Sequence, residues 1–359
     1  MNHASIIPNH TTRMYDGVVL ERIKSLPPGG KMADLPSHLQ HKSFERVGCK
    51  KTGGPNLRIL RLETEKPSLT VTGYIFNKFV HPVEDRYITP REAACLQDFP
   101  RNFEFCGTLG QVQTAIGNAV PVNLGAALGK QVVRYFRDLR RTGMIDVASY
   151  FTGAGGLDLG LELASERSVD VQMRTRYCSD IEPSAVATLL RNRPEWNPEL
   201  ADIRSLSPDH VRSFLREKNL ILVGGPPCQP FSVAGKQLGT SDPLGVLYRD
   251  YLKHVECLSP ELVIMENVYG MAQGNSGAVV AEIRRSFEGM GFGVHFIELL
   301  AARFGTPQLR RRVIFAAARH PELWRWPEPT HSETADLCGL KRFTGAGESF
   351  AGLPAPKII

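Results

Sequence analysis

The sequence has no uninterrupted apolar stretch of the roughly 20 residues that a membrane-spanning helix needs, so we expect no transmembrane segment and no membrane partner. Residues 1–17 also lack the apolar core of a secretory signal. Hydrophobic residues make up 42% and charged residues 22% of the 359 positions, which is typical of a soluble globular protein with a substantial core. These features predict a cytoplasmic protein.

Paired cysteines are also lacking. The chain has seven cysteines, an odd number, and no two of them form a C-x-x-C pair. Disulfide frameworks and structural zinc sites depend on such pairs. We therefore expect a reducing compartment, no disulfide framework and no bound metal.

A strong net charge is absent too, because the whole chain carries only +6. Residues 1–143 contain 20 Lys and Arg against 12 Asp and Glu, a net +8, whereas residues 144–359 contain 23 against 25, a net −2. A basic N-terminal part suits a surface that faces a polyanion such as nucleic acid. An ordinary basic surface would account for the same numbers.

From residue 144 onward, short apolar runs alternate with helical patterns. The predicted strands span residues 145–150, 176–178, 220–223, 262–265, 294–299 and 313–317, and the predicted helices span residues 157–163 and 184–192. This alternation predicts an α/β fold in which helices cover both faces of a parallel or mixed sheet.

The first 143 residues are less regular. Helices are predicted over residues 18–26, 89–99 and 123–137, a turn-containing loop over 111–121, and short β-like runs over 57–62 and 68–72. Thr89 and Glu92 have the spacing of a capping box. The polar segment 36–80 holds too few apolar residues to fold securely alone. Its side chains could contact phosphates and base edges, or they could simply face solvent.

The stretch Leu220–Lys236 is the most informative part of the chain. A buried strand ends at two glycines and two prolines, and Cys228 follows in a loop. Ligands of open α/β sheets bind at this carboxyl edge. A rigid approach before Cys228 and a flexible segment after it, Ser232–Gly245, suit a thiolate that meets a large substrate. An isolated cysteine is more often a small buried hydrophobe, so the neighbouring motifs decide.

A second loop, Phe151–Gly156, has the glycine content for close approach of its backbone to a ligand. Asp180 ends the next strand and could accept hydrogen bonds from ribose hydroxyls, and Asp202 could accept one from an adenine amino group. The loop lacks the complete G-x-G-x-x-G pattern and a phosphate-binding lysine. A nucleoside ligand without phosphates therefore fits better than NAD.

Glu266 and two arginines add further polar groups near strand ends. Glu266 follows the buried run 262–265, where a carboxylate is costly to bury unless it binds a ligand, although it could instead cap the next helix. Arg310 and Arg312 flank Arg311 and are expected to point to one face of an extended strand. Two guanidinium groups on one face repel each other unless they bind anions or electron-rich oxygens. A basic edge strand is the alternative.

Together these motifs resemble those of the DNA (cytosine-5) methyltransferase family over residues 15–331. FTGAGG is similar to the family's first motif, GGPPCQPFS to its catalytic motif, and MENV and GTPQLRRRVIF to its ENV and Q-x-R-x-R motifs. TPREAACLQDFP and IGNAVP resemble the last two motifs, but here they precede the first. The resemblance implies a Rossmann-like S-adenosylmethionine-dependent methyltransferase fold with a mixed sheet, plus a small irregular target-recognition domain.

The changed motif order looks like a circular permutation, so we expect the two termini to be neighbours in space. The expected domains are residues 1–105, a small target-recognition domain with the family's ninth motif; residues 106–322, the catalytic domain; and residues 323–359, a hinge that returns to the small domain. Every family motif is present, so the permutation puts no catalytic residue in doubt.

The resemblance implies methyl transfer from S-adenosylmethionine to C5 of a flipped cytosine in specific double-stranded DNA sites, through a covalent bond between Cys228 and C6. Glu266 would hydrogen-bond N3 and the 4-amino group, while Arg310 or Arg312 would hold O2 and favour the thiolate. The residues implied to bind the cofactor are Phe151, Gly153, Gly155, Gly156, Asp180, Ile181, Asp202, Ile203, Pro227, Asn118 and Ala119. Those implied to bind the substrate are Gln229, Asn267 and Gln308.

The family also implies a bacterial or phage context, a role in host protection or restriction–modification, and a monomer that needs no cognate restriction endonuclease for activity. An RNA cytosine-5 methyltransferase on the same scaffold is the nearest alternative, and the basic N-terminal part favours DNA. A non-catalytic DNA-binding protein would be expected to have lost Cys228, Glu266 or the arginines, and all are retained.

Overall fold

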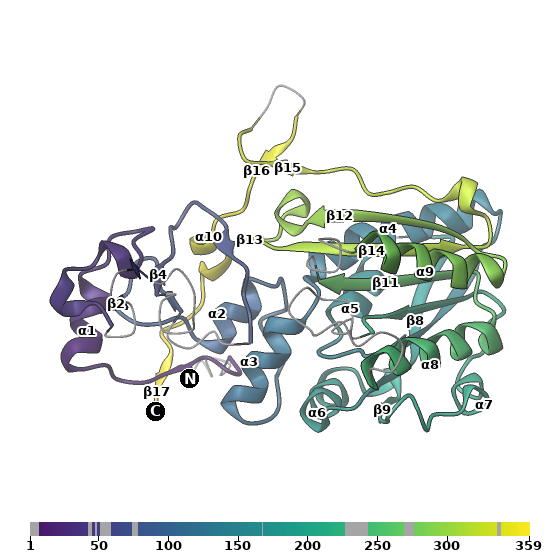
Figure 1. Cartoon of the computed structure of the whole chain (residues 1–359), viewed down its shortest axis with the longest axis horizontal. Coiled ribbons are helices and arrows are strands. Elements are labelled where there is room, and N and C mark those ends of the chain that lie inside the picture. Colours follow the sequence, from purple (N-terminus) through teal and green to yellow (C-terminus); the bar gives the residue numbers. More distant parts are fainter. Residues whose placement is uncertain are drawn as a thin grey trace, which may run out of the picture. The chain divides into compact units, whose positions relative to one another are not determined.

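The structure is a computed structural model that describes residues 7–41, 45–46, 49–50, 59–73, 78–166, 168–226, 243–268, 276–335 and 339–359. The chain folds into two compact units (Figure 1). The small unit comprises Met1–Ala119, Ala302–Arg310 and Thr330–Ile359, and the sheet unit comprises Val120–Ala301 and Arg311–Pro329. This division differs from the expected boundaries in placing residues 106–119 and 302–310 with the small unit, and residues 323–329 with the sheet.

The sheet unit is built on seven strands in the order β12-β14-β11-β10-β7-β8-β9. The strands are β7 (Gly143–Tyr150), β8 (Val171–Asp180), β9 (Pro198–Leu200), β10 (Leu220–Gly224), β11 (Leu262–Val268), β12 (Gly293–Leu300) and β14 (Arg311–Ala318). Neighbours pair in parallel except β14, which is antiparallel to both β11 and β12. The predicted mixed sheet is therefore confirmed, with a strand at each of the six predicted positions.

Helices cover both faces of this sheet, as Figure 1 shows for α8 and α9 on one side and α4 and α5 on the other. The helices of this unit are α4 (Val122–Asp138), α5 (Gly156–Ser165), α6 (Pro183–Asn192), α7 (Pro208–Arg212), α8 (Pro243–Leu258) and α9 (Ser276–Gly289). Glycines let α4 and α5 approach closely, since a Cβ atom on Gly160 would lie 2.4 Å from the Val122 carbonyl oxygen. The core on the side of α8 and α9 contains large side chains such as Tyr251 of α8 and Phe287 of α9.

Successive strands are added to opposite sides of the neighbouring parallel strands β7 and β10. From β7 the chain continues through α5 to β8 on one side, whereas from β10 it continues through α8 to β11 on the other. Tyr150 and Gly224, the last residues of β7 and β10, are paired in register. This is the topological switch point of the sheet, where open α/β folds bind ligands.

The small unit consists of short elements around an apolar core of its own. Its helices are α1 (Gly17–Lys24), α2 (Pro90–Cys95), α3 (Leu109–Asn118) and α10 (Ala346–Phe350), and its strands are β1 (Thr11–Thr12), β2 (Glu45–Arg46), β3 (Cys49–Lys50), β4 (Leu60–Arg61), β5 (Ser68–Leu69), β6 (Phe79–Val80), β13 (Gln308–Leu309), β15 (His331–Ser332), β16 (Lys341–Arg342) and β17 (Lys357–Ile358). The capping box at Thr89 and Glu92 is present. Within the described residues, no helix of either unit combines the length and apolarity needed to cross a membrane.

The prediction of a loop over residues 111–121 is wrong, because most of this segment belongs to α3. Thr108 and Gln111 form a capping box at the start of this helix. Val112 and Ile116, four residues apart, are both buried, so they form the apolar stripe of a short helix. The Gly117-Asn118 pair, which suggests a turn, ends the helix instead.

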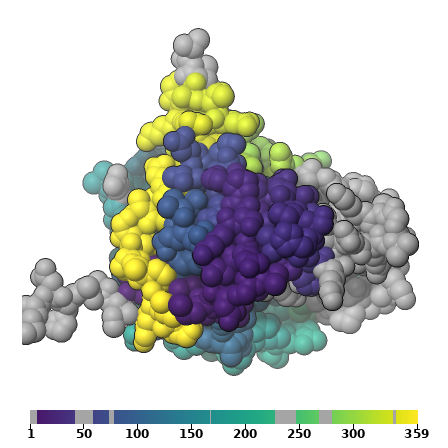
Figure 2. Space-filling model, turned by 90° about the vertical axis from the view of Figure 1, so that its left-hand side faces the viewer, coloured from purple at the N-terminus to yellow at the C-terminus, as the bar shows by residue number. Residues whose placement is uncertain are grey.

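The expected closeness of the two termini holds for the described residues of the small unit. Strand β1 pairs in parallel with β17, and the Ile359 N–H donates to the Thr12 carbonyl at 2.9 Å. The His10 ring also bonds the Pro354 carbonyl at 2.7 Å. Figure 2 shows the N-terminal segment in purple beside the C-terminal segment in yellow on one face.

Candidate active site

The glycine loop after β7 adopts a backbone that favours glycine. Phe151, Gly153 and Gly155 have φ angles of 54°, 57° and 76°, in the left-handed region. At Gly155, a Cβ atom would lie 2.8 Å from side-chain atoms of both Leu189 and Trp196. At Gly153, a Cβ would meet no atom of the described residues within 4 Å. The loop therefore packs tightly at Gly155 and leaves open backbone at Gly153.

Asp180, at the end of β8, connects this loop to the neighbouring strand. Its Oδ2 accepts a hydrogen bond from the Gly153 N–H at 2.7 Å, and its Oδ1 accepts one from the Glu182 N–H at 2.9 Å. Burial raises the pKa of Asp180, and these two backbone donors oppose the rise. Each carboxylate oxygen keeps a further lone pair, so Asp180 can still accept a hydrogen bond from a ligand hydroxyl.

These residues fit a nucleoside such as the one in S-adenosylmethionine. Beside the carboxylate, Ile181 is 59% exposed and offers an apolar surface to a ring. Asp202 is paired with Arg204, which lowers the pKa of Asp202. Ile203 is buried in the core against which Phe151 packs. The cofactor contacts of Asp202 and Ile203 stay predictions, as does that of Gly156 at the start of α5.

The ends of β10 and β11 bring a second polar cluster together. Glu266 and Arg312 form an ion pair with 2.5 Å between Oε1 and Nε. A Cβ atom on Gly225 would lie 3.3 Å from Glu266 Oε2, and the Asn267 side chain donates to the Pro226 carbonyl at 3.0 Å. Both carboxylate and guanidinium are largely buried, at 13% and 10% exposure. The segment that leads directly to Cys228 therefore lies beside Glu266 and Asn267, and Glu266 is in turn paired with Arg312.

Three predicted site residues, Pro227, Cys228 and Gln229, lie outside the described residues, as does most of the predicted lid. Their contacts stay predictions. What the structure establishes is the polar surroundings of the two residues that precede them, Gly225 and Pro226.

The prediction that one continuous strand carries Arg310 and Arg312 is wrong, although both side chains are buried and Arg311 between them is exposed, as the predicted alternation requires. Strand β13 ends at Leu309 and pairs with β5 in the small unit, whereas β14 begins at Arg311 in the large sheet. Arg310 belongs to neither strand. Its guanidinium donates to the Val71 and Gly117 carbonyls, each at 2.8 Å. On either side of Arg310 the backbone therefore hydrogen-bonds to a different sheet.

Gln308, Asn118 and Ala119 also belong to the small unit. Gln308 is fully buried, and its amide is hydrogen-bonded to Leu96, Gln97 and Val71. Asn118, the last residue of α3, is exposed, whereas Ala119 is buried. Gln308 therefore meets protein groups in this structure, and its predicted substrate contact stays a prediction.

Two buried polar residues are missed by the sequence prediction. Gln97 donates to the Ile116 carbonyl at 2.8 Å, and Asp158 accepts from the Ser149 hydroxyl at 3.1 Å. Gln97 lies inside TPREAACLQDFP and Asp158 lies two residues after FTGAGG, and no spacing in the sequence singles out either side chain. Only the fold supplies their partners.

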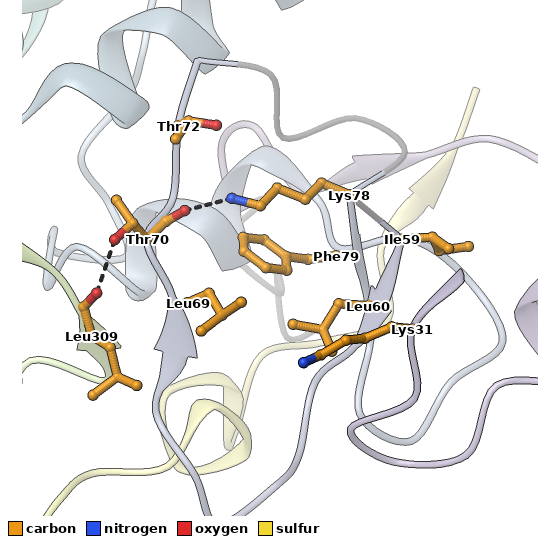
Figure 3. Close-up of a pocket in the computed structure, with 9 residues that line it drawn as sticks. All are labelled: Lys31, Ile59, Leu60, Leu69, Thr70, Thr72, Lys78, Phe79 and Leu309. Carbon is orange, nitrogen blue, oxygen red and sulfur yellow. Dashed lines mark hydrogen bonds between the residues drawn. The ribbon is translucent and has the colours of Figure 1, made fainter. Parts of the chain in front are cut away.

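The small unit also contains a cavity of about 500 Å³, drawn in Figure 3. It is lined by Lys31, Ile59, Leu60, Leu69, Thr70, Thr72, Lys78, Phe79 and Leu309. The Lys78 ammonium lies 4.4 Å from the centre of the Phe79 ring and donates to the Thr70 carbonyl at 2.6 Å. An apolar floor with cationic and hydroxyl groups at its margin can receive a ligand that combines a flat ring with negative charge.

Comparison with protein families gives one match that covers most of the chain. The model of the C-5 cytosine-specific DNA methylase family matches residues 30–134 and 145–344. The match is therefore interrupted near the connection between α4 and β7.

Curated relatives are similar over about half of the chain. The type II methyltransferase M1.HphI of Haemophilus parahaemolyticus is 34% identical over 206 residues, which cover 55% of this chain and 53% of that protein. M.AquIA of Picosynechococcus sp. is 33% identical over 224 residues, which cover 57% of this chain and 88% of that protein. The chain thus spans about half the length of the first of these relatives. Among solved structures, the S. pombe Dnmt2 methyltransferase is 23% identical, with a TM-score of 0.39 and coverage of 48% of this chain and 50% of that one.

Proposed function

Because the chain belongs to the C-5 cytosine-specific DNA methylase family, we propose that it transfers a methyl group from S-adenosylmethionine to C5 of a cytosine in double-stranded DNA. The observation that carries this proposal is the buried pair Glu266–Arg312 beside Gly225 and Pro226. Only two peptide links separate Pro226 from Cys228, so their Cα atoms lie within about 7 Å of each other. The Cys228 thiolate, the Glu266 carboxylate and the Arg312 guanidinium can therefore contact the same cytosine base.

The residues have complementary tasks on the cytosine ring. C5 is a poor nucleophile, and addition of the Cys228 thiolate to C6 makes it electron-rich. Glu266 hydrogen-bonds the N3 and 4-amino edge and stabilises the charge that develops there, while Arg312 holds O2. S-adenosylmethionine, when bound, supplies the electrophilic methyl group. Loss of the C5 proton to solvent and elimination of the Cys228 thiolate from C6 then restore the pyrimidine ring.

The glycine loop and the ends of the neighbouring strands would hold that cofactor. Phe151, Gly153 and Asp180 offer open backbone and a carboxylate with free lone pairs, and Ile181 offers an exposed apolar face. The remaining proposed contacts are made by Gly155, Gly156, Asp202, Ile203, Pro227, Asn118 and Ala119.

We place the DNA-recognition function in the small unit. A stacked cytosine must leave the duplex to reach a buried nucleophile, so other parts of the protein must hold the DNA backbone. Within the small unit, residues 1–119 contain 15 Lys and Arg against 11 Asp and Glu, a net +4, and the cavity of Figure 3 carries Lys31, which is exposed, and Lys78. From this exposed position, Lys31 can neutralise a phosphate. The similar relatives are type II methyltransferases, which supports a role in host protection or restriction–modification.

The test is a substitution of the nucleophile. Cys228→Ser should abolish methyl transfer to duplex DNA while leaving the dissociation constant for S-adenosylhomocysteine unchanged, because the thiolate acts only on the base. DNA containing 5-fluorocytosine should form a covalent adduct with the wild-type protein, visible as a mass increase on a peptide containing Cys228.

The matched control is Cys257→Ser, since Cys257 is an exposed free cysteine of α8. This variant should retain both transfer and adduct formation. Full methylation by Cys228→Ser would remove Cys228 from the mechanism. Bisulfite sequencing of DNA from cells that express the wild-type protein identifies the modified site, and faster transfer to tRNA than to duplex DNA would contradict the proposed substrate.

A further inference from the structure

We propose that Gln97, Gln308 and Arg310 form a buried clasp that positions the end of α3, and with it Asn118, for the cofactor. Gln308 and Arg310 would then be positioning residues for methyl transfer rather than substrate-binding residues. The inference rests on the proposed function, because it takes S-adenosylmethionine as the ligand of Asn118.

Arg310 bridges two backbone segments with the two ends of its planar fork. Nη1 donates to the Val71 carbonyl and Nη2 donates to the Gly117 carbonyl, both at 2.8 Å. Gly117 directly precedes Asn118, so this contact fixes the peptide next to the proposed ligand. Carbonyls in the last turn of a helix lack intrahelical partners, and a cation there also interacts favourably with the helix dipole.

The two glutamines complete the clasp. Gln308 accepts from the Val71 N–H at 2.8 Å and donates to the Gln97 side chain at 3.1 Å. Gln97 in turn donates to the Ile116 carbonyl at 2.8 Å. Val71 is therefore held at both its N–H and its carbonyl, and the last turn of α3 receives two side-chain hydrogen bonds from outside the helix.

Burial separates these three residues from a role at the DNA surface. Gln97, Gln308 and Arg310 are each 0% exposed, so none presents a polar group to solvent. Gly117 packs against the backbone held by the clasp, because a Cβ atom there would lie 2.3 Å from the Gly73 nitrogen. A shift of Val71–Gly73 therefore forces a shift of Gly117 and of the adjoining Asn118.

The two arginines of the Q-x-R-x-R segment, Arg310 and Arg312, thus have different roles. Arg312 pairs with Glu266 beside the segment that leads to Cys228, whereas Arg310 faces backbone carbonyls at the end of α3. A substitution at Arg310 should consequently weaken cofactor binding, while one at Arg312 should slow the chemical step.

The experiment measures the dissociation constant of S-adenosylhomocysteine by calorimetry for the full chain, without DNA. Arg310→Lys keeps the charge and loses the fork, so it should weaken binding about 10-fold or more, in line with the loss of a charged hydrogen bond. Asn118→Ala should weaken binding too. The double variant should bind no more weakly than the weaker single variant, because residues that act through one another are not additive.

The control is Arg61→Lys, which changes another buried arginine of the small unit that donates to backbone carbonyls, here those of Ile23 and Leu26. It should lower the thermal midpoint without changing the dissociation constant. If Arg310→Lys lowered only the midpoint, or raised only the KM for DNA, the positioning role would be refuted. If the wild-type chain failed to bind S-adenosylhomocysteine, the proposed function itself would fail, which is a distinct result.

Discussion

The carboxyl group of Asp158 is buried and only partly hydrogen-bonded. It lies in the first turn of α5 and is 1% exposed. Its Oδ2 accepts from the Ser149 hydroxyl at 3.1 Å, while Oδ1 is buried without a hydrogen-bond partner among the described residues. Burial raises the pKa of Asp158 to about 7. The side chain is therefore protonated in the folded protein at acidic pH.

This shift predicts the sign of a pH effect on stability. An unfolded aspartate has a pKa of about 3.9, so between about pH 4 and pH 7 the folded state binds more protons than the unfolded state. The free energy of unfolding must then fall as pH rises, by on the order of 4 kcal/mol for this group. Asp158→Asn, which stays neutral, should lack this loss. Urea-unfolding midpoints measured at about pH 5 and pH 8 should show that the stability of the variant relative to the wild type is greater at the higher pH.

A difference between the two proteins that did not change with pH would show that Asp158 ionises normally. Ser165→Ala, which removes a buried hydroxyl on the same helix, is the control and should shift stability equally at both pH values.

At this scale, the sequence predicts residue types better than their partners. Glu266 and Asp180 stand out because a charged residue directly follows a buried strand, and strand ends gather at one edge of a parallel sheet. The substrate roles of Arg310 and Gln308 are expected from the resemblance to the Q-x-R-x-R motif. Their actual partners, the backbone of Val71 and of α3, lie more than 190 positions away in sequence, and no local pattern encodes such contacts.

Among the elements, α3 shows how two local signals can conflict. Gly117-Asn118 is typical of a turn, yet Thr108 and Gln111 cap a helix that runs up to it. The buried strands are easier to predict, because continuous runs such as Leu220–Val223 and Leu262–Met265 have few alternatives between turn residues. Their order in the sheet depends on contacts between distant segments, so no local pattern supplies it.

The two glycines of α3 give a test of why the helix ends as it does. A Cβ atom on Gly110, in the first turn, would meet nothing within 4 Å among the described residues, whereas at Gly117 that atom would lie 2.3 Å from the Gly73 nitrogen. Gly110→Ala should therefore stabilise the protein by about 0.5–1 kcal/mol, since alanine favours the helix. Gly117→Ala should destabilise it by about 1–3 kcal/mol through overpacking. Urea unfolding of both variants measures the difference, and equal effects would contradict the close approach of α3 to residues 72–73.

At the scale of the whole molecule, the changed order of the motifs can be compared with the positions of the terminal segments. Strands β1 and β17 pair in parallel, so the described terminal residues are hydrogen-bonded neighbours. The match to the family model is interrupted between residues 134 and 145, and α4 ends at Asp138 while β7 begins at Gly143. We propose that the chain is a circular permutant of the family's usual order, in which this short connection joins segments that are elsewhere the two ends.

The prediction is that the permutation can be reversed. Joining Ile359 to Met1 through a short glycine–serine linker and opening the chain between Arg141 and Thr142 should give a protein that folds and methylates at a rate within about tenfold of the original. Strands β1 and β17 already pair with each other, so the linker and the residues before β1 together close a short loop at a small entropic cost. The new opening falls in a connection of exposed residues, where cuts are tolerated best.

The matched control opens the same joined chain between Val147 and Ala148, inside the buried strand β7. That cut removes strand pairing on both sides, with β8 and with β10, and should abolish folding as judged by circular dichroism and cofactor binding. If the chain opened at Arg141 also failed to fold and to bind the cofactor, the connection from α4 to β7 would be a necessary part of the fold. The motif order could then not be explained as a permutation of an otherwise unchanged structure.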